Sequence, residues 1–184
     1  MKKNNIMLLT GILLFSSFSS ISCGNKSKAT EATEKVITVQ VPPFDADSAY
    51  QYVKDQVDFG PRVPNTQAHV DCGNYLAGQL EKFGAKVTSQ YADLVAYDGT
   101  LLKARNIIGS YNPENKKRIA LFAHWDSRPW ADNDPDEKNH YTPILGANDG
   151  GSGVGVLLEI ARQIQQQQPE LGIDIIFLDA EDYG

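Results

Sequence analysis

The stretch IDIIFLDAED, residues 173–182, decides the fold that the sequence predicts. Its first half is rich in β-branched and aromatic residues, which favours a strand in the interior of a sheet. A cluster of acids follows directly, namely Asp179, Glu181 and Asp182. Strands of α/β proteins that carry chemistry end in this way at their carboxyl edge. We therefore expect a functional site at the carboxyl edge of a sheet.

A second apolar run, RIALFAH at 118–124, is expected to be another buried strand. The segment 150–168 between the two runs, GGSGVGVLLEIARQIQQQQ, is expected to be a helix. A strand, a helix and a strand in succession predict a right-handed crossover and parallel pairing, so both strands end at the same edge. Five polar residues then come together there: His124, Asp126, Asp149, Glu181 and Asp182.

Helices and a hairpin are expected before these strands. Residues 45–60 form a helix capped by Asp45 or Asp47, and residues 67–83 form a helix capped by Thr66 and stopped by Gly84. Two extended runs flank Asp98-Gly99, KVTSQYADLVAY and LLKARNIIGSY, and this dipeptide favours a tight turn between antiparallel strands. The polar loop from about 126 to 148 is long enough to indicate a functional loop.

Length and composition indicate a globular chain with one domain. The 184 residues are 41% hydrophobic and 22% charged, and a net charge of −6 disfavours a nucleic-acid partner. Cys72 is expected to be a buried apolar residue on one helix face, and its partners on that face are Leu76, Leu80 and Phe83.

Residues 1–22 have the pattern of a signal for export: a positive start, an apolar stretch and an exit of small residues. Cys23 follows in a sequence that resembles a bacterial lipoprotein cleavage box, while a plain secretory signal with an incidental cysteine is the alternative. We expect a periplasmic or outer-membrane lipoprotein that contacts the membrane only through a lipid on Cys23. Residues 23–35 are expected to be a flexible tether, and residues 36–184 the folded domain, which begins with a short strand at 36–41.

The five converging residues have the chemistry of a zinc site. His124, Asp149 and Asp182 offer an imidazole nitrogen and carboxylate oxygens, which zinc accepts, and Asp126 could orient the imidazole. Glu181 could face the substrate as a free carboxylate. Each has a structural alternative: Asp149 as a helix N-cap, His124 as a hydrogen-bonded structural histidine, and the terminal acids as a solvated strand end. The glycine-rich GGSGVG lacks the spacing of phosphate-binding loops.

Four motifs carry a family resemblance: FGPRVPNTQAH (59–69), AHWDSRPWADND (123–134), LGANDGGSGVGVLLEIAR (145–162) and LDAEDYG (178–184). Together they resemble the zinc metallopeptidase family typified by zinc aminopeptidases, and within it the bacterial exported glutaminyl-peptide cyclotransferases. The resemblance implies an α/β/α sandwich with a mixed central sheet. It also implies that Asp149 and Asp182 bind zinc and that Glu181 is the general acid/base. His124 matches a ligand of the second zinc in two-metal aminopeptidases, so its role here stays open.

The implied reaction converts the N-terminal glutamine of peptides or proteins to pyroglutamate and releases ammonia. A zinc aminopeptidase of the same family, or a non-catalytic binding module, is the alternative. The family's third zinc ligand is a later histidine, and the only histidines here are His69, His124 and His140, none in that place. We therefore expect these 184 residues to be the N-terminal half of such a domain, inactive alone, with the last strand at an open edge.

Overall fold

The structure is a computed structural model that describes residues 40–183. The expected signal peptide (1–22), Cys23 and the tether (23–35) lie outside the described residues, as does most of the strand expected at 36–41. Residues 40–183 form three α-helices, one short 3-10 helix at Glu137–Asn139 and four strands. None of these helices combines the length and the apolar character that crossing a membrane requires.

The first two helices begin at the caps that the sequence predicts. Helix α1 spans Ala46–Asp58, and the carboxylate of Asp45 accepts a hydrogen bond from the Ser48 backbone N–H at 3.0 Å. Helix α2 spans Gln67–Lys82 and has Thr66 as its N-cap. Such caps bind backbone N–H groups that have no partner inside the helix. The chain leaves α2 through Gly84, whose φ of +85° suits glycine.

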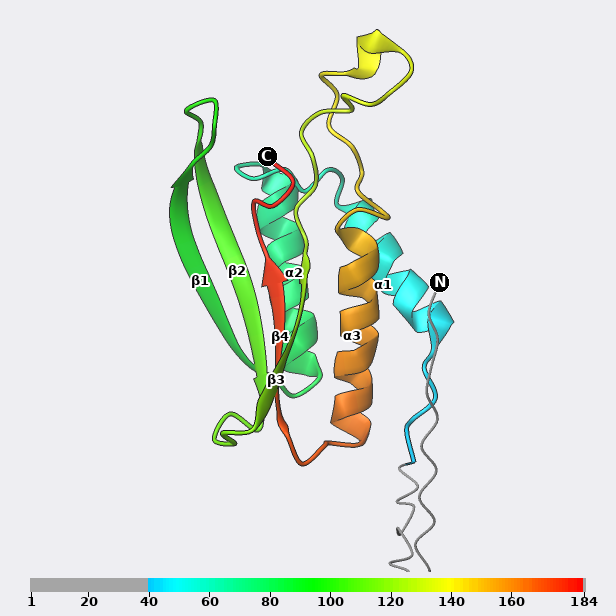
Figure 1. Cartoon of the computed structure of the whole chain (residues 1–184). Coiled ribbons are helices and arrows are strands. Elements are labelled where there is room, and N and C mark those ends of the chain that lie inside the picture. The colour runs from blue at the N-terminus through cyan, green and yellow to red at the C-terminus, as the bar shows by residue number, and fades with distance from the viewer. Residues whose placement is uncertain (1–39, 184) are drawn as a thin grey trace, which may run out of the picture. The chain divides into compact units, whose positions relative to one another are not determined.

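The four strands form one mixed sheet (Figure 1). They are β1 (Lys86–Val95), β2 (Leu101–Tyr111), β3 (Arg118–His124) and β4 (Gly172–Leu178). Strands β1 and β2 pair antiparallel as a hairpin, β2 and β4 pair antiparallel, and β3 and β4 pair parallel. The predicted hairpin, the parallel pairing of the last two strands and the α/β class are confirmed.

Strand β3, and not β4, lies at the edge of this sheet. The order is β1-β2-β4-β3, so β4 is paired on both sides. The expectation that the last strand lies at an open edge is therefore wrong. The expectation that RIALFAH is a buried strand is also wrong, because Ile119 is 46% exposed and Phe122 67% exposed. The reason is the pairing of β4 with the distant β2, which no local pattern specifies.

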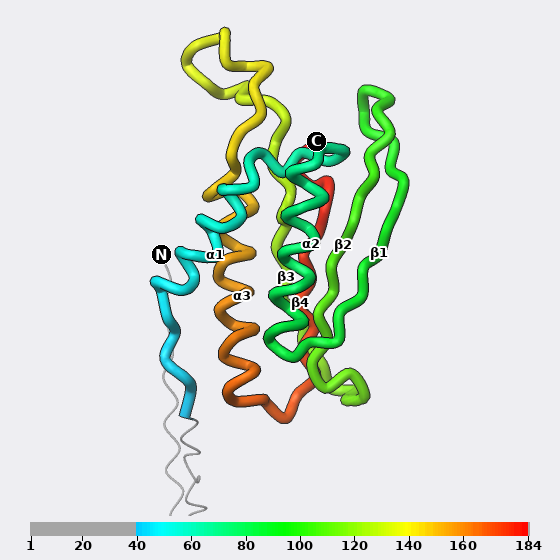
Figure 2. Tube along the Cα trace, turned by 180° about the vertical axis from the view of Figure 1, so that it is seen from behind, coloured from blue at the N-terminus to red at the C-terminus, as the bar shows by residue number. Residues whose placement is uncertain are grey.

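Helix α2 packs on β1 and β2, and helix α3 (Gly151–Gln166) packs on β3 and β4. The two helices also contact each other, so they cover the same face of the sheet in the described residues (Figure 2). The core lies between this face and the helices, and it includes Cys72, Leu76, Leu80 and Phe83 as predicted. Burial raises the pKa of Cys72 to about 12, which keeps the thiol protonated and unreactive.

Helix α1 packs on α3 at a close approach of the two backbones. A Cβ added at Gly155 would lie 2.6 Å from Val53 Cγ2 and 2.8 Å from the Ala49 carbonyl oxygen. Only glycine fits there, so this residue of the LGANDGGSGVGV motif serves helix packing.

The carboxyl ends of β3 and β4 and the first turn of α3 lie at the same end of the molecule (Figure 1). The loop between His124 and Gly151 extends from this end, and so does the turn of the β1–β2 hairpin (Figure 1). This is the crossover geometry that the sequence predicts, and it brings the acidic segment after β4 next to the end of β3.

Candidate metal-binding and catalytic site

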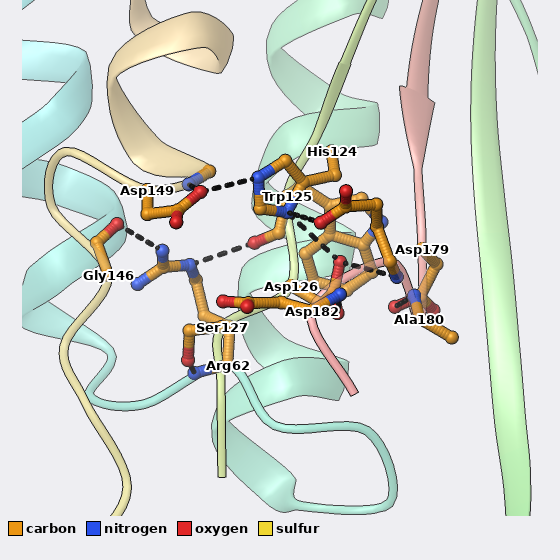
Figure 3. A network of polar contacts seen from close by, with 12 residues as sticks. Arg62, His124, Trp125, Asp126, Ser127, Gly146, Asp149, Asp179, Ala180 and Asp182 are labelled. Carbon is orange, nitrogen blue, oxygen red and sulfur yellow. Dashed lines mark hydrogen bonds and ion pairs between the residues drawn. The ribbon is translucent and has the colours of Figure 1, made fainter. Parts of the chain in front are cut away.

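His124 stands at the end of β3 among three carboxylates (Figure 3). Its Nε2 lies 2.8 Å from an oxygen of Asp149, and its Nδ1 lies 3.4 Å from Asp126 and 3.6 Å from Glu181. The carboxylate of Asp126, and then those of Asp149 and Glu181, raise the pKa of His124 to about 9 against the effect of burial. An imidazole without a metal is therefore held as a cation in this cluster.

Asp149 is aimed at His124 by the turn that leads into α3. The N-cap of α3 is Gly150, with φ +63°, and no side chain caps this helix. The alternative in which Asp149 is the helix cap is therefore wrong: its carboxylate contacts His124 and accepts from the neighbouring Gly150 N–H at 3.2 Å. A Cβ at Gly150 would meet the Asp126 carbonyl oxygen at 2.8 Å, so glycine is required for this approach.

Asp126 has a second function that the sequence did not indicate. Its side chain is fully buried, and its two oxygens accept hydrogen bonds from the backbone N–H groups of Glu181 at 3.3 Å and Asp182 at 3.0 Å. Besides facing His124, this carboxylate thus holds the backbone of the acidic segment after β4. Because the bonds go to backbone amides, residue types at 181 and 182 give no signal of them.

Asp182 carries a buried carboxylate oxygen, Oδ2, that has no hydrogen-bond partner in the described part of the chain. Burial, and then the charges of Asp149 and Asp126, raise the pKa of Asp182 to about 6. A bound cation would relieve both the missing partner and the repulsion. The side chain of Glu181, in contrast, is 63% exposed and free to face a substrate.

The donor set fits a metal such as zinc by its chemistry, since it comprises one imidazole and several carboxylates around an unpartnered oxygen. Among residues 40–183, however, no three His, Cys, Asp or Glu side chains are spaced so that they could hold one ion. His124 and Asp149 are in direct contact instead. The predicted residues are neighbours, while their roles as ligands and as acid/base stay predictions.

The other two histidines serve elsewhere. His69, near the start of α2, contacts Asp179, and His140 lies in the long loop with its Nε2 2.9 Å from the Asp134 carbonyl oxygen. Neither belongs to the cluster around His124.

Arg62, in the motif FGPRVPNTQAH, is buried in this region, and no role was predicted for it from the sequence (Figure 3). Its guanidinium donates to the carbonyl oxygens of Trp125 at 3.0 Å, Leu145 at 2.6 Å and Gly146 at 2.7 Å. Its backbone N–H donates to Ser127 Oγ at 2.8 Å. One side chain thus ties together the chain after His124 and the chain before Asp149.

Parts of this chain are similar to known proteins. The model of the family described as Peptidase family M28 matches residues 106–184, a range that contains all five converging residues. A structure described as Bacteroides thetaiotaomicron glutaminyl cyclase bound to N-acetylhistamine is 86% identical with a TM-score of 0.78, covering 79% of this chain and 50% of that one.

Two further structures have related descriptions. A leucine aminopeptidase precursor from Bacteroides thetaiotaomicron VPI-5482 is 85% identical with a TM-score of 0.79, covering 80% of this chain and 51% of that chain. A Zn-dependent exopeptidase from Parabacteroides distasonis ATCC 8503 is 70% identical with a TM-score of 0.78, covering 79% and 50%. The chain thus spans about half the length of these proteins, and less than half of the curated relatives that it matches. Residues 106–184 are thus similar to peptidase family M28, and the described residues share the fold of these solved structures.

Proposed function

We propose that the protein is a zinc-dependent glutaminyl-peptide cyclotransferase, which converts the N-terminal glutamine of peptides or proteins to pyroglutamate and releases ammonia. The observation that carries the proposal is the unpartnered, buried oxygen of Asp182 beside Asp149 and His124, with the exposed Glu181 next to it. The 86% identity to a protein named glutaminyl cyclase supports it.

Asp149 and Asp182, with His124 beside them, are the residues that would hold the zinc ion. The 70% identity to a protein named a Zn-dependent exopeptidase supports this choice of metal. A bound zinc ion supplies a Lewis acid that polarises the oxygen of the substrate's side-chain amide. Asp126 keeps the backbone of Asp182 in place through its hydrogen bond.

Glu181 is the proposed proton carrier. The α-amino nitrogen of the substrate glutamine attacks its own side-chain amide carbon, and Glu181 accepts the proton that this nitrogen loses. Glu181 then returns the proton to the amide nitrogen as the carbon–nitrogen bond breaks and ammonia leaves. Nucleophile and electrophile belong to one residue, so much of the positioning is already present in the substrate. The 63% exposure of the Glu181 side chain allows this contact.

An aminopeptidase of the same family is the second candidate. The 85% identity to a protein named as a leucine aminopeptidase precursor favours it. Peptide hydrolysis requires an activated water, whereas cyclisation requires none, so the products separate the two activities.

The test incubates the complete, zinc-loaded protein with a peptide that begins with glutamine and follows the products by mass spectrometry. The proposal expects a peptide lighter by the mass of one ammonia, with no free amino acid. Release of free N-terminal glutamine would assign the protein to the aminopeptidases instead. A peptide that begins with asparagine is the matched substrate control, because its shorter side chain cannot close the same five-membered ring.

Two substitutions separate the proposed roles. Asp149→Ala should lose zinc and turnover together, while Glu181→Gln should keep zinc and lose turnover. Asp47→Ala and Glu170→Gln are matched controls at exposed positions, and both should resemble the wild type. Full turnover in Glu181→Gln would remove this residue from the mechanism.

We also propose that the protein is exported and anchored by a lipid on Cys23, as the leader sequence suggests. Labelling of bacterial cells with a radioactive fatty acid should mark the wild type and leave Cys23→Ser unlabelled. Label retained by Cys23→Ser would refute the anchor.

A further inference from the structure

Asp179 has a buried carboxylate with no place in the proposed reaction (Figure 3). Its Oδ2 accepts from the Arg105 backbone N–H at 2.6 Å, and its Oδ1 accepts from the Ala180 backbone N–H at 2.8 Å. His69 Nε2 lies 2.9 Å from Oδ1 and 2.8 Å from Oδ2. An ionised carboxylate only accepts hydrogen bonds, so Nε2 carries the proton in this contact.

His69 is fixed from two further sides. It is only 3% exposed, and its ring stacks on that of Trp125 with centroids 4.3 Å apart and planes at 17°. Its backbone N–H donates to the cap residue Thr66 at 3.2 Å. Trp125 lies between His124 and Asp126 in the sequence. In the motif HWD, the Trp125 side chain thus packs on His69, while the His124 and Asp126 side chains lie in the proposed site.

The turn after Asp179 has an unusual backbone. Ala180 has φ +61°, the left-handed conformation, which is unfavourable by about 1–2 kcal/mol for a residue with a Cβ. Asp179 holds this turn from one side through the Ala180 N–H. Asp126 holds it from the other side through the N–H groups of Glu181 and Asp182. The three acidic side chains of this turn therefore lie in different surroundings. Asp179 is buried, Glu181 faces solvent, and Asp182 is mostly buried near the carboxylates around His124.

We propose that Asp179, with His69 as its hydrogen-bond donor, is a positioning residue that fixes the left-handed turn at Ala180 and thereby the places of Glu181 and Asp182. The inference rests on the proposed function for its catalytic consequence. Asp179 acts through the backbone, and neither it nor His69 touches the substrate. A displacement of Glu181 by about 1 Å is enough to slow a reaction of this kind about a hundredfold.

Three variants of the complete protein test the pair. Asp179→Asn keeps one acceptor oxygen and has an NH₂ group in place of the other, although Arg105, Ala180 and His69 all donate to this side chain. We expect kcat to fall about tenfold or more while KM stays within about threefold. His69→Leu should give a similar loss because it removes the donor. His69→Gln keeps a donor and should restore kcat to within about threefold of the wild type. Leu80→Ala, in the core far from the turn, is the control: it lowers stability and leaves kcat unchanged.

Hydrogen exchange provides a readout that does not depend on activity. In Asp179→Asn, the amides of Ala180 and Glu181 should exchange about tenfold faster than in the wild type, while amides in α3 keep their rates. The proposal would be overturned if exchange rates rose uniformly across the protein, or if neither Asp179→Asn nor His69→Leu folded. The pair would then be a general stabilising contact.

The two proposals fail separately. Wild-type kcat and exchange in Asp179→Asn would overturn the positioning role and leave the cyclase function intact. A wild type that does not cyclise glutamine would overturn the function, and the exchange rates around Ala180 would still decide the positioning role.

Discussion

Replacement of Arg62 by methionine tests how the two halves of the site are joined. The methionine side chain is unbranched and apolar, so it occupies part of the buried space but donates no hydrogen bond. Three carbonyl oxygens lose the guanidinium donor: that of Trp125 is buried, that of Leu145 is partly buried, and that of Gly146 keeps the Gly151 N–H at 3.1 Å. A buried carbonyl without a partner costs about 1–3 kcal/mol, and relief of the buried charge offsets part of it.

We therefore expect Arg62→Met to lower the free energy of unfolding by about 2 kcal/mol. Urea denaturation followed by tryptophan fluorescence measures it, because Trp125 is fully buried next to this cluster. The slope of the free energy of unfolding against urea concentration should not change, since the folded state stays compact. Arg62→Lys keeps the positive charge but lacks the planar guanidinium. Its free energy of unfolding should therefore lie between those of the wild type and Arg62→Met.

Lys54→Met is the control, because it removes a cation from an exposed pair with Asp58 and should leave the midpoint unchanged. The reasoning on Arg62 is refuted if Arg62→Met unfolds at the wild-type urea concentration. It is also refuted if Arg62→Met and Lys54→Met shift the midpoint equally.

Two further predictions concern packing and pH. Gly155→Ala should lower stability by about 1–3 kcal/mol because its Cβ meets α1. Gly78→Ala has open space around its Cβ and should raise stability by up to about 1 kcal/mol. Thermal melts of both variants check this, and equal shifts of the melting temperature would contradict it. The Arg118 guanidinium lowers the pKa of Asp174, so this pair stabilises the fold above the unfolded pKa of about 3.9 and the contribution is lost as the pH falls through the lower folded pKa. Asp174→Asn should therefore flatten the decrease of stability below about pH 5 in urea titrations, and an unchanged pH profile would refute it.

The helices and the hairpin could be predicted because their signals are local. Asp45 and Thr66 cap helices within three residues of the N–H groups that they bind, and Asp98-Gly99 joins neighbouring strands. The convergence of His124 with Glu181 and Asp182 also follows from the sequence, because crossover connections have a fixed hand.

The strand order is different in kind. Strand β4 pairs with β2 as well as with β3, and the sequence contains no local sign of the first pairing. The apolar run RIALFAH therefore looked like a buried strand, although in the described sheet it lies at the edge. Sequence patterns report how apolar a strand is, and they do not report which neighbours it has.

The sequence by itself determined the secondary structure, the parallel pair of strands and the residue types that meet at their carboxyl ends. Only the tertiary structure decided what surrounds them. Asp126 accepts hydrogen bonds from the backbone N–H groups of residues 181 and 182, and His69 contacts Asp179, which is 110 positions away. The physical reason is that these bonds join backbone groups or segments remote in the chain. Backbone amides are common to all residues except proline, and contacts over long separations depend on the packing of the whole domain.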